Sequence, residues 1–165
     1  MTAYLAANRT GVTIQQLAAA IASPDVKGTY EGLVIPRKLP APNEVVDAAP
    51  VYRAAMATHR PALVKLYADT FAANRLDAIV FPTVPRTALP ATAEASSVPN
   101  FLLFIQNTDP GSNAGAPGIQ LPMGMGARSR LPIGLELDGP AGSDRRLLAI
   151  GMALESLLGR VPAAR

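Results

Sequence analysis

The chain has 165 residues, 49% of them hydrophobic, and its 15 Lys and Arg residues against 12 Asp and Glu residues give a net charge of +3. This length and composition predict one domain with a core. The absence of Cys excludes disulfides, thiolate zinc sites and cysteine nucleophiles. The basic residues are scattered and aromatic residues make up only 5%, so we expect no nucleic-acid partner.

The N-terminal segment, residues 1–17, has neither a basic start nor a continuous apolar stretch, and so does not resemble a signal peptide. No apolar run approaches the roughly 20 residues that a membrane-spanning helix needs. We therefore expect no membrane partner and a cytoplasmic location.

Residues 1–75 are expected to be mainly helical. A short helix is predicted over residues 2–9. A second helix begins after Thr13, because Thr13 and Gln16 have the spacing of a capping box, in which each side chain satisfies a free backbone N–H of the other residue. Pro24 is expected to end this second helix.

A Pro-rich excursion over residues 27–50 interrupts the helical part. It is predicted to run along the surface, with a strand-like fragment at Leu33–Ile35. Lys27 and Lys38 lie in this segment. A lysine acts as a catalytic base only when burial lowers its pKa, so in an exposed segment these two are interpreted as solvated side chains.

The longest helical region is predicted over Asn43–Asn74, because apolar residues recur there at spacings of three and four. Pro61 is expected to kink it or to divide it into two abutting helices. The single histidine, His59, lies just before this break. No nucleophile motif accompanies it, so a structural or exposed histidine is favoured over a catalytic base.

Residues 76–165 are expected to hold the strands, a Gly- and Pro-rich loop and the final helix. Leu76–Phe81 is apolar and partly β-branched, which predicts a buried strand, and the helical segments on both sides favour a parallel one. Thr83 follows in a stiff Pro-flanked turn. Its side chain either faces a pocket at the strand end or bonds to its own loop.

The segment Arg86–Pro99 is polar and Pro-rich and predicts an irregular lid or linker. Its Ser96–Ser97 pair has no activating partner nearby, so we interpret it as part of a loop. A helix of one or two turns is predicted over Phe101–Asn107.

Glycines 111, 115 and 118 lead into the next strand, but their spacing is not that of a phosphate-binding loop. Small residues there predict close packing against a neighbouring backbone, and Asn113 is expected to hold the turn by bonds from its side chain to the backbone.

Two strands are predicted at Gly118–Pro122 and Leu131–Leu137, joined as a long hairpin across Met123–Arg130. Proline cannot donate to a sheet ladder, so Pro122 is expected at a strand end or a bulge.

The final helix is predicted to begin at Ser143 or Asp144 and to stop at Gly159. Leucines at helical spacing between these limits predict a buried face.

Three segments, taken in order, resemble the C-terminal third of amidase signature enzymes: LDAIVFPTVPRTALP, NAGAPGIQLPMG and RLPIGLELDGPAGSDRRLLAIGMALE. SPDVKGTYEG and the helix around Arg60 also look like this family, and the chain is most similar to the branch that contains indoleacetamide and mandelamide hydrolases.

The resemblance implies an α/β class, here a partial amidase-signature α/β/α fold with a few-stranded mixed sheet and flanking helices. It also implies hydrolysis of an amide C–N bond by a Ser that a second Ser and a Lys activate. Those residues belong to a Gly- and Ser-rich signature and to the segment before it. No such signature exists in residues 1–165, so no catalytic residue is assigned.

The expected substrate-binding residues are Thr83, Gln106, Asn107 and Thr108, with Phe104 or Ile105 contacting the apolar group of the substrate. No metal ligands and no cofactor are expected. The residues expected to form a structural motif are Asn113, Gly115, Pro117, Gly118, Pro122 and Gly124.

Residues 1–165 are therefore interpreted as the C-terminal part of an amidase domain that supplies strands and part of a substrate pocket and is inactive alone. Its partner would be a small amide, once an N-terminal catalytic half completes the site. The alternatives are a non-catalytic assembly module, which pairs with itself as a homo-oligomer or with a catalytic half, and a nonfunctional remnant.

Overall fold

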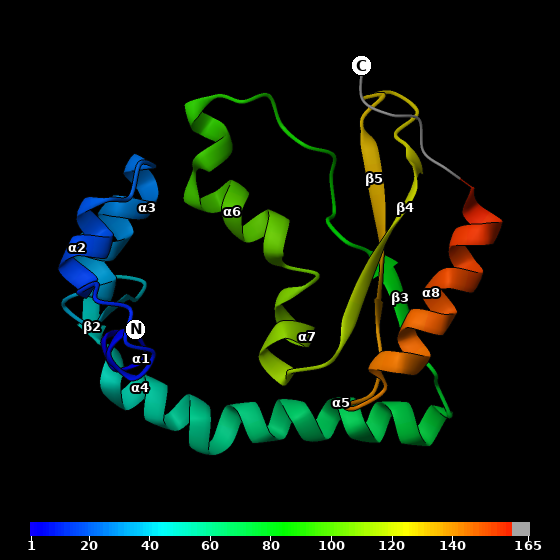
Figure 1. Ribbon diagram of the computed structural model, residues 1–165, viewed down its shortest axis with the longest axis horizontal. Coiled ribbons are helices and arrows are strands. Elements are labelled where there is room, and N and C mark those ends of the chain that lie inside the picture. Colours follow the sequence, from blue (N-terminus) through cyan, green and yellow to red (C-terminus); the bar gives the residue numbers. More distant parts are fainter. Residues whose placement is uncertain (160–165) are drawn as a thin grey trace. The chain divides into compact units, whose positions relative to one another are not determined.

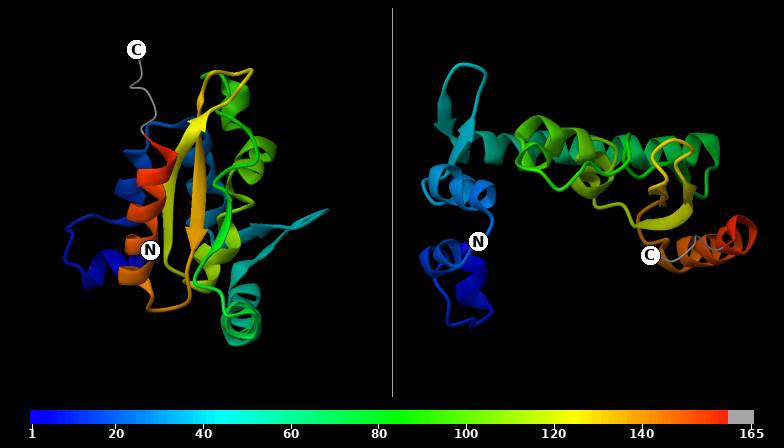
Figure 2. Two further views of the ribbon diagram at one scale, coloured as in Figure 1. Left: turned by 90° about the vertical axis from the view of Figure 1, so that its right-hand side faces the viewer. Right: turned by 90° about the horizontal axis from the view of Figure 1, so that it is seen from above.

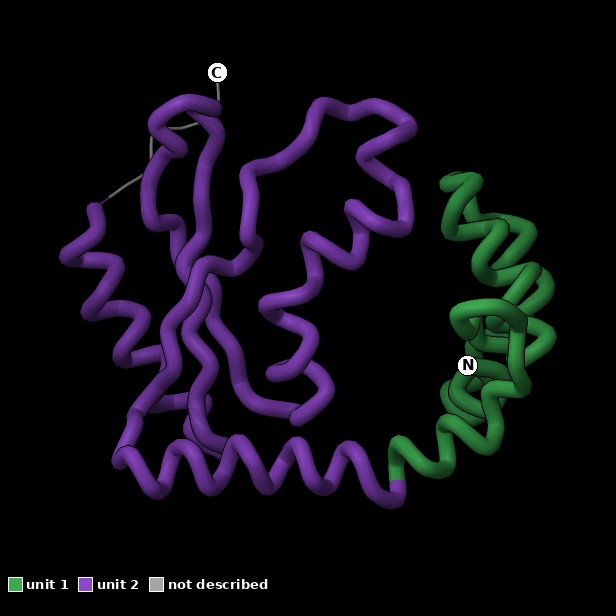
Figure 3. The backbone as a smooth tube through the Cα atoms, turned by 180° about the vertical axis from the view of Figure 1, so that it is seen from behind, with its two compact units in different colours: residues 1–56 green, residues 57–165 purple. Residues whose placement is uncertain are grey.

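The computed structural model describes residues 1–159. The chain divides into two compact units, Met1–Met56 and Ala57–Arg165 (Figure 3). Helices alternate with two small sheets, so the expected α/β class is confirmed. No helix among the described residues has the length and apolarity that crossing a membrane requires.

The first unit opens with helices α1 (Thr2–Ala7) and α2 (Ile14–Ala19). The predicted capping box is confirmed. The Gln16 backbone N–H donates to Thr13 Oγ1 at 3.1 Å, and the Thr13 backbone N–H donates to Gln16 Oε1 at 2.8 Å. Two backbone donors that the first turn of a helix leaves free are thereby satisfied.

Helix α3 (Pro24–Thr29) begins at the proline that was expected to end the preceding helix. The fixed φ of proline suits the first turn of a helix, where its missing N–H costs nothing. The chain continues into a π-helical turn, η1 (Tyr30–Val34). The strand-like fragment predicted at Leu33–Ile35 is therefore wrong, because local helix continuation outweighs the β propensity of its residues.

The remainder of the first unit holds a hairpin of β1 (Lys38–Pro40) and β2 (Val45–Asp47), paired antiparallel. Helix α4 (Ala48–Ala54) follows directly. Asp47 caps it, because its Oδ1 accepts from the Ala49 backbone N–H at 3.4 Å.

The interruption predicted near Pro61 is present. A π-helical turn, η2 (Ala55–His59), leads into α5 (Arg60–Asn74), and Pro61 occupies the first turn of α5. The helical region begins at α4 rather than at Asn43. Arg75 ends α5 in the left-handed conformation, with φ of 51°.

The second unit is built on a three-stranded sheet of β3 (Ile79–Pro82), β5 (Pro132–Asp138) and β4 (Gly118–Met125), in the order β3-β5-β4. Both pairings are antiparallel. The parallel orientation expected for the first strand is wrong, because the neighbour of β3 is the returning strand of a hairpin rather than a strand reached by a helical crossover.

Strands β4 and β5 form the hairpin that the sequence predicts, with a register shift between Pro122 and Gly124. Pro122 thus lies at a bulge, where its missing N–H breaks no regular ladder. The Gly126 backbone N–H donates to the Leu131 carbonyl at 2.8 Å and closes the turn, so the connection is shorter than expected.

Helix α8 (Asp144–Leu158) covers one face of the sheet (Figures 1 and 2). The core lies between them and centres on Leu121, Leu137 and Leu147. Gly151 lets the helix approach closely, because a Cβ there would lie 2.9 Å from Ile119 Cδ1. The predicted start and end of this helix are confirmed, although the Ser143 side chain makes no capping hydrogen bond.

The other face of the sheet is turned toward α7 (Asp109–Ala114) (Figures 1 and 2). Before α7 the chain forms a 3-10 turn, η3 (Ala93–Ser96), and helix α6 (Val98–Ile105). Helix α5 packs against α7, and the Arg60 Nε–H donates to the Asn113 carbonyl at 3.0 Å.

Candidate functional site

A cavity of about 520 Å³ lies at the C-terminal end of β3, within the second unit. Its walls come from the turn after β3, from α6 and from the upper part of the β4–β5 hairpin. They are mostly apolar, as in small-molecule sites. The lining residues are Pro82, Val84, Pro85, Arg86, Thr87, Ala88, Phe104, Met123, Pro132, Ile133 and Gly134.

Two hydrogen bonds hold the turn that forms one wall. The Thr83 backbone N–H donates to the Gly134 carbonyl at 3.1 Å and extends the sheet by one residue. The Asn107 Nδ2 donates to the Pro82 carbonyl at 2.8 Å. This second bond ties the junction between α6 and α7 to the end of β3, and so places α6 beside the cavity.

Thr83 lies between two lining residues, Pro82 and Val84, but does not itself line the cavity. Its Oγ1 is buried and has no hydrogen-bond partner among the described residues. The sequence left two alternatives for this side chain, facing a pocket or bonding to its own loop. The side chain makes no hydrogen bond to its loop.

The other expected substrate-binding residues are spread along the α6–α7 junction. Asn107 uses its amide on the Pro82 carbonyl, and the Thr108 Oγ1 donates to the Ile105 carbonyl at 3.2 Å. Gln106 is exposed at the end of α6. Only Phe104, expected to contact an apolar group, lines the cavity. Binding of substrate by the other three remains a prediction.

The Gly- and Pro-rich segment forms the end of α7 and the start of β4. The Asn113 Nδ2 donates to the Asp109 carbonyl at 2.9 Å, a local bond from side chain to backbone. Gly115 ends α7 with φ of 74°, a left-handed conformation that favours glycine. The Pro117 carbonyl then accepts from the Gly139 backbone N–H at 2.8 Å. This last bond joins the loop to the residue that follows β5.

Two carboxyl groups on β5 were not singled out from the sequence. Asp138 is buried with 6% of its surface exposed, and Glu136 lies two residues before it on the same face. Burial raises the pKa of the Asp138 carboxyl, and the nearby Glu136 charge raises it further. In the sequence, these two groups are visible only as acidic residues in an otherwise apolar strand.

Tyr67 on α5 shares this environment. Burial raises the pKa of its hydroxyl, and the charge of Asp138 adds to the shift. Burial at this end of the sheet therefore favours the neutral forms of the Asp138 carboxyl and the Tyr67 hydroxyl.

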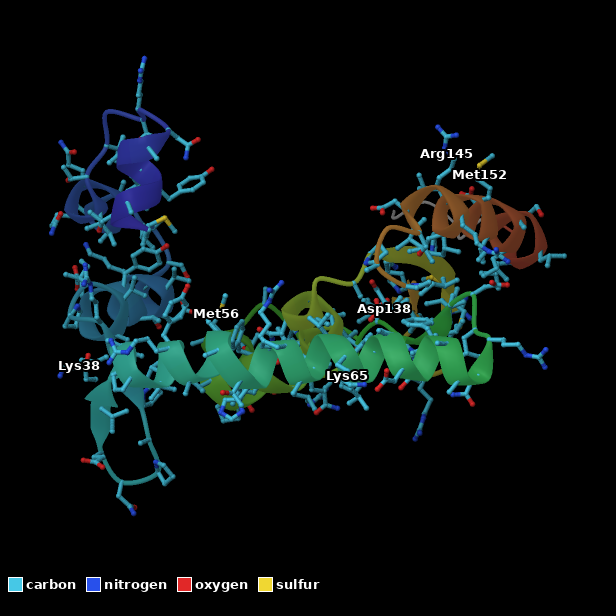
Figure 4. The ribbon with its side chains drawn as sticks, turned by 90° about the horizontal axis from the view of Figure 1, so that it is seen from below. Lys38, Met56, Lys65, Asp138, Arg145 and Met152 are labelled. Carbon is cyan, nitrogen blue, oxygen red and sulfur yellow. The ribbon has the colours of Figure 1, made fainter. Side chains whose placement is uncertain are left out.

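The described residues hold no assembled nucleophile. No serine hydroxyl is hydrogen-bonded to a lysine in residues 1–159, and no group of potential metal ligands gathers there. Lys65 projects from α5 and pairs with Asp69 at 2.6 Å, with both side chains exposed (Figure 4).

The family model described as Amidase matches residues 23–148. The chain belongs to the amidase family. It is 43% identical over 163 residues to mandelamide hydrolase of Pseudomonas putida, which spans 98% of this chain and 32% of that relative. It is 46% identical over 114 residues to indoleacetamide hydrolase of Rhizobium radiobacter, which spans 66% of this chain and 24% of that relative.

A solved structure described as an amidase superposes on this amidase-family chain with a TM-score of 0.63 at 27% identity. The superposition covers 89% of this chain and 31% of that structure. The chain thus spans about a third or less of the length of the amidase relatives that it matches. The resemblance stated from the sequence motifs is confirmed.

Proposed function

We propose that the chain is the C-terminal portion of an amide hydrolase, in which it supplies sheet strands and one wall of the substrate pocket. The observation that carries this proposal is the apolar cavity at the end of β3 in a chain of the amidase family. Small-molecule sites are typically mostly apolar pockets of this size with a few polar groups. Residues 1–165 are taken together as part of one amidase domain, and its cytoplasmic location stays a prediction.

The substrate that fits this cavity is an amide with an aromatic group. Phe104 and Met123 offer a ring and a polarisable thioether, both of which make favourable contacts with aromatic rings. The names of the two hydrolases described above, mandelamide and indoleacetamide hydrolase, are those of aryl-substituted amides. A volume of about 520 Å³ accommodates a phenyl or indole group.

We expect no hydrolysis by the chain alone. Attack on an amide needs a nucleophile with an activating base at hydrogen-bond distance. In the described residues Lys65 is bound to Asp69, and Ser97 Oγ contacts the Asn100 amide. The proposal therefore assigns the bond-breaking residues to a separate, N-terminal catalytic half.

The test is complementation with the segment of Pseudomonas putida mandelamide hydrolase that this chain does not match. Each piece is purified alone and after co-expression, and ammonia release from mandelamide is measured. Release by the co-expressed pair and by neither piece alone is the expected result. Turnover by this chain alone, lost on Thr108→Ala, contradicts the proposal.

Phe104→Ala tests the aromatic pocket in the same assay. Removing the ring shrinks the apolar wall, so KM for mandelamide is expected to rise several-fold. Phe101→Ala is the matched control, because Phe101 lies on the same helix with 57% of its surface exposed and does not line the cavity. Equal effects of the two changes contradict a pocket at this place.

A second function, a non-catalytic assembly module, is favoured by the surface of α6. Val98, Phe101 and Leu102 recur there at helical spacing and are exposed. Such a helix face is normally covered. Size-exclusion chromatography tests self-pairing: a concentration-independent monomer contradicts it, and a dimer that Phe101→Asp dissociates supports it.

A further inference from the structure

Gly134 leaves a gap between two polar side chains beside the cavity. It lies on β5, lines the cavity, and pairs with Pro122 of β4 across the sheet. A Cβ built on it would lie 2.7 Å from Thr83 Oγ1 and would overlap Gln120 Nε2. Any side chain at this position would therefore displace both groups. Because position 134 has no side chain, the Thr83 hydroxyl and the Gln120 carboxamide both lie close to the Gly134 backbone.

The Thr83 hydroxyl is not satisfied by the described part of the chain. Its oxygen is inaccessible to solvent and has no hydrogen-bond partner. Burying a hydroxyl without a hydrogen-bond partner is unfavourable, so a ligand that supplies a partner gains from this group. The Thr83 backbone N–H is already used on the Gly134 carbonyl, which holds the hydroxyl beside the gap.

Gln120 borders the gap from strand β4. Its Nε2 makes a hydrogen bond of 3.2 Å to the neighbouring Leu121 carbonyl, and the residue is exposed. Nothing beyond this local bond holds the amide in place among the described residues. Breaking one local hydrogen bond of an exposed side chain costs little, so a ligand can displace the Gln120 amide from its place beside Thr83 Oγ1.

The two polar groups that border the gap, the Thr83 hydroxyl and the Gln120 carboxamide, are neutral. Glu136 is the cross-strand partner of Gln120, and its Oε1 lies toward Gly118, where a Cβ would lie 3.1 Å from it. The cavity also includes Arg86, whose residue is exposed to solvent. A hydroxyl and a carboxamide beside a mostly apolar cavity suit a ligand group that both donates and accepts hydrogen bonds without charge.

We propose that Thr83 Oγ1 and the Gln120 side-chain amide bind the neutral polar substituent, a hydroxyl or a carboxamide, of an aromatic ligand whose ring occupies the cavity. This inference rests on the proposed function, because it assumes that the cavity accepts an aromatic ring. It assigns substrate discrimination to two residues whose polar groups both border Gly134.

The experiment measures binding of three neutral probes to the full chain by NMR titration. Phenylacetamide carries a carboxamide, 2-phenylethanol carries a hydroxyl, and toluene carries neither. The variants are Thr83→Val, which keeps the shape of the side chain, and Gln120→Met, which keeps its length. Thr92→Val is the matched control, because Thr92 is exposed and does not line the cavity. Thr83→Ser restores the hydroxyl.

Thr83→Val and Gln120→Met are expected to weaken binding of the polar probes by roughly three- to tenfold, the range of one net hydrogen bond, and to leave toluene unchanged. Thr92→Val changes none, and Thr83→Ser retains most of the wild-type affinity. The probe weakened more strongly identifies the preferred substituent.

Unchanged binding of both polar probes in the two variants overturns the inference while the aromatic pocket stands, provided toluene binds. Absence of toluene binding to the wild-type chain overturns both the inference and the proposed pocket. Tighter binding of phenylacetate than of phenylacetamide, lost on Arg86→Ala and kept in Thr83→Val, also overturns it, because the site then selects an anion.

Discussion

The carboxyl group of Asp138 lies directly against the backbone of Gly111. A Cβ built on this glycine would lie 3.0 Å from the Asp138 Cγ and would overlap its Oδ2. Helix α7 and strand β5 meet at this point because one partner has no side chain. Both residues are buried, so neither can move into solvent to relieve a clash.

Gly111→Ala is therefore expected to lower the free energy of unfolding by about 1–3 kcal/mol, the usual effect of overpacking a filled interior. Urea unfolding followed by circular dichroism measures the change.

Gly28→Ala is its matched control. Gly28 lies in α3, and a Cβ there would meet nothing within 4 Å in the described part of the chain. Alanine favours a helix interior over glycine by about 0.5–1 kcal/mol, so this change is expected to stabilise the chain slightly. Equal losses in the two variants would contradict the contact between Gly111 and Asp138.

The raised pKa of Asp138 predicts that stability falls as pH rises. Its carboxyl is protonated more readily in the folded than in the unfolded chain, whose pKa is about 3.9. Above that pH the folded state therefore binds more protons than the unfolded state. The free energy of unfolding falls as pH rises, until the pH exceeds the pKa of Asp138 in the folded chain. Asp138→Asn is expected to remove this slope and to be more stable than wild type at pH 7.

The unfolding free energy measured between pH 3 and pH 8 checks this prediction. Glu136→Gln is expected to reduce the slope only partly, because burial is the larger cause of the shift and Glu136 the smaller one. Asp77→Asn is the control, since Asp77 is exposed and pairs with Arg146 at 2.7 Å. If Asp138→Asn kept the pH dependence of the wild-type chain, the assignment of that dependence to Asp138 would be wrong.

Leu137 is the most deeply buried side chain of the core, with none of its surface exposed. Leu137→Ala is expected to cost about 2–5 kcal/mol, from lost burial and from the cavity left under α8. Leu148→Ala on the outer side of α8, where 57% of the leucine is exposed, is expected to change stability little. Thermal unfolding of the two variants measures the difference.

The bond from Asn107 to the Pro82 carbonyl predicts an effect on both stability and binding. Asn107→Ala removes a hydrogen bond worth about 0.5–1.5 kcal/mol and releases α6 from the end of β3. We expect weaker toluene binding, because Phe104 then loses its fixed place in the cavity wall. Gln106→Ala, which alters an exposed neighbour, is expected to leave toluene binding intact. A larger loss of toluene binding in Gln106→Ala than in Asn107→Ala would contradict the positioning role of Asn107.

Local features were predictable from the sequence. The capping box at Thr13, the interruption near Pro61, the bulge at Pro122 and the final helix each depend on residues only a few positions apart, whose stereochemistry acts without the rest of the fold. The fragment at Leu33–Ile35 failed, because a helix that started at Pro24 continued through it.

The candidate site was predictable only in part. The end of β3 and Phe104 were identified, because strand ends and apolar helix residues are visible in the sequence. Gln120 was missed, because its place beside Thr83 depends on the register of β4 and β5 and on the missing side chain of Gly134.

The sequence by itself determined the family, the positions of most helices and strands, and the lack of an assigned catalytic residue, since these follow from residue types and short spacings. The tertiary structure decided the antiparallel partner of β3, the burial of Asp138 against Gly111, and the cavity that α6 and the β4–β5 hairpin close. Each of these joins residues distant along the chain. Strand pairing and close packing depend on whether surfaces far apart in the sequence fit together. Patterns of neighbouring residues do not contain this information.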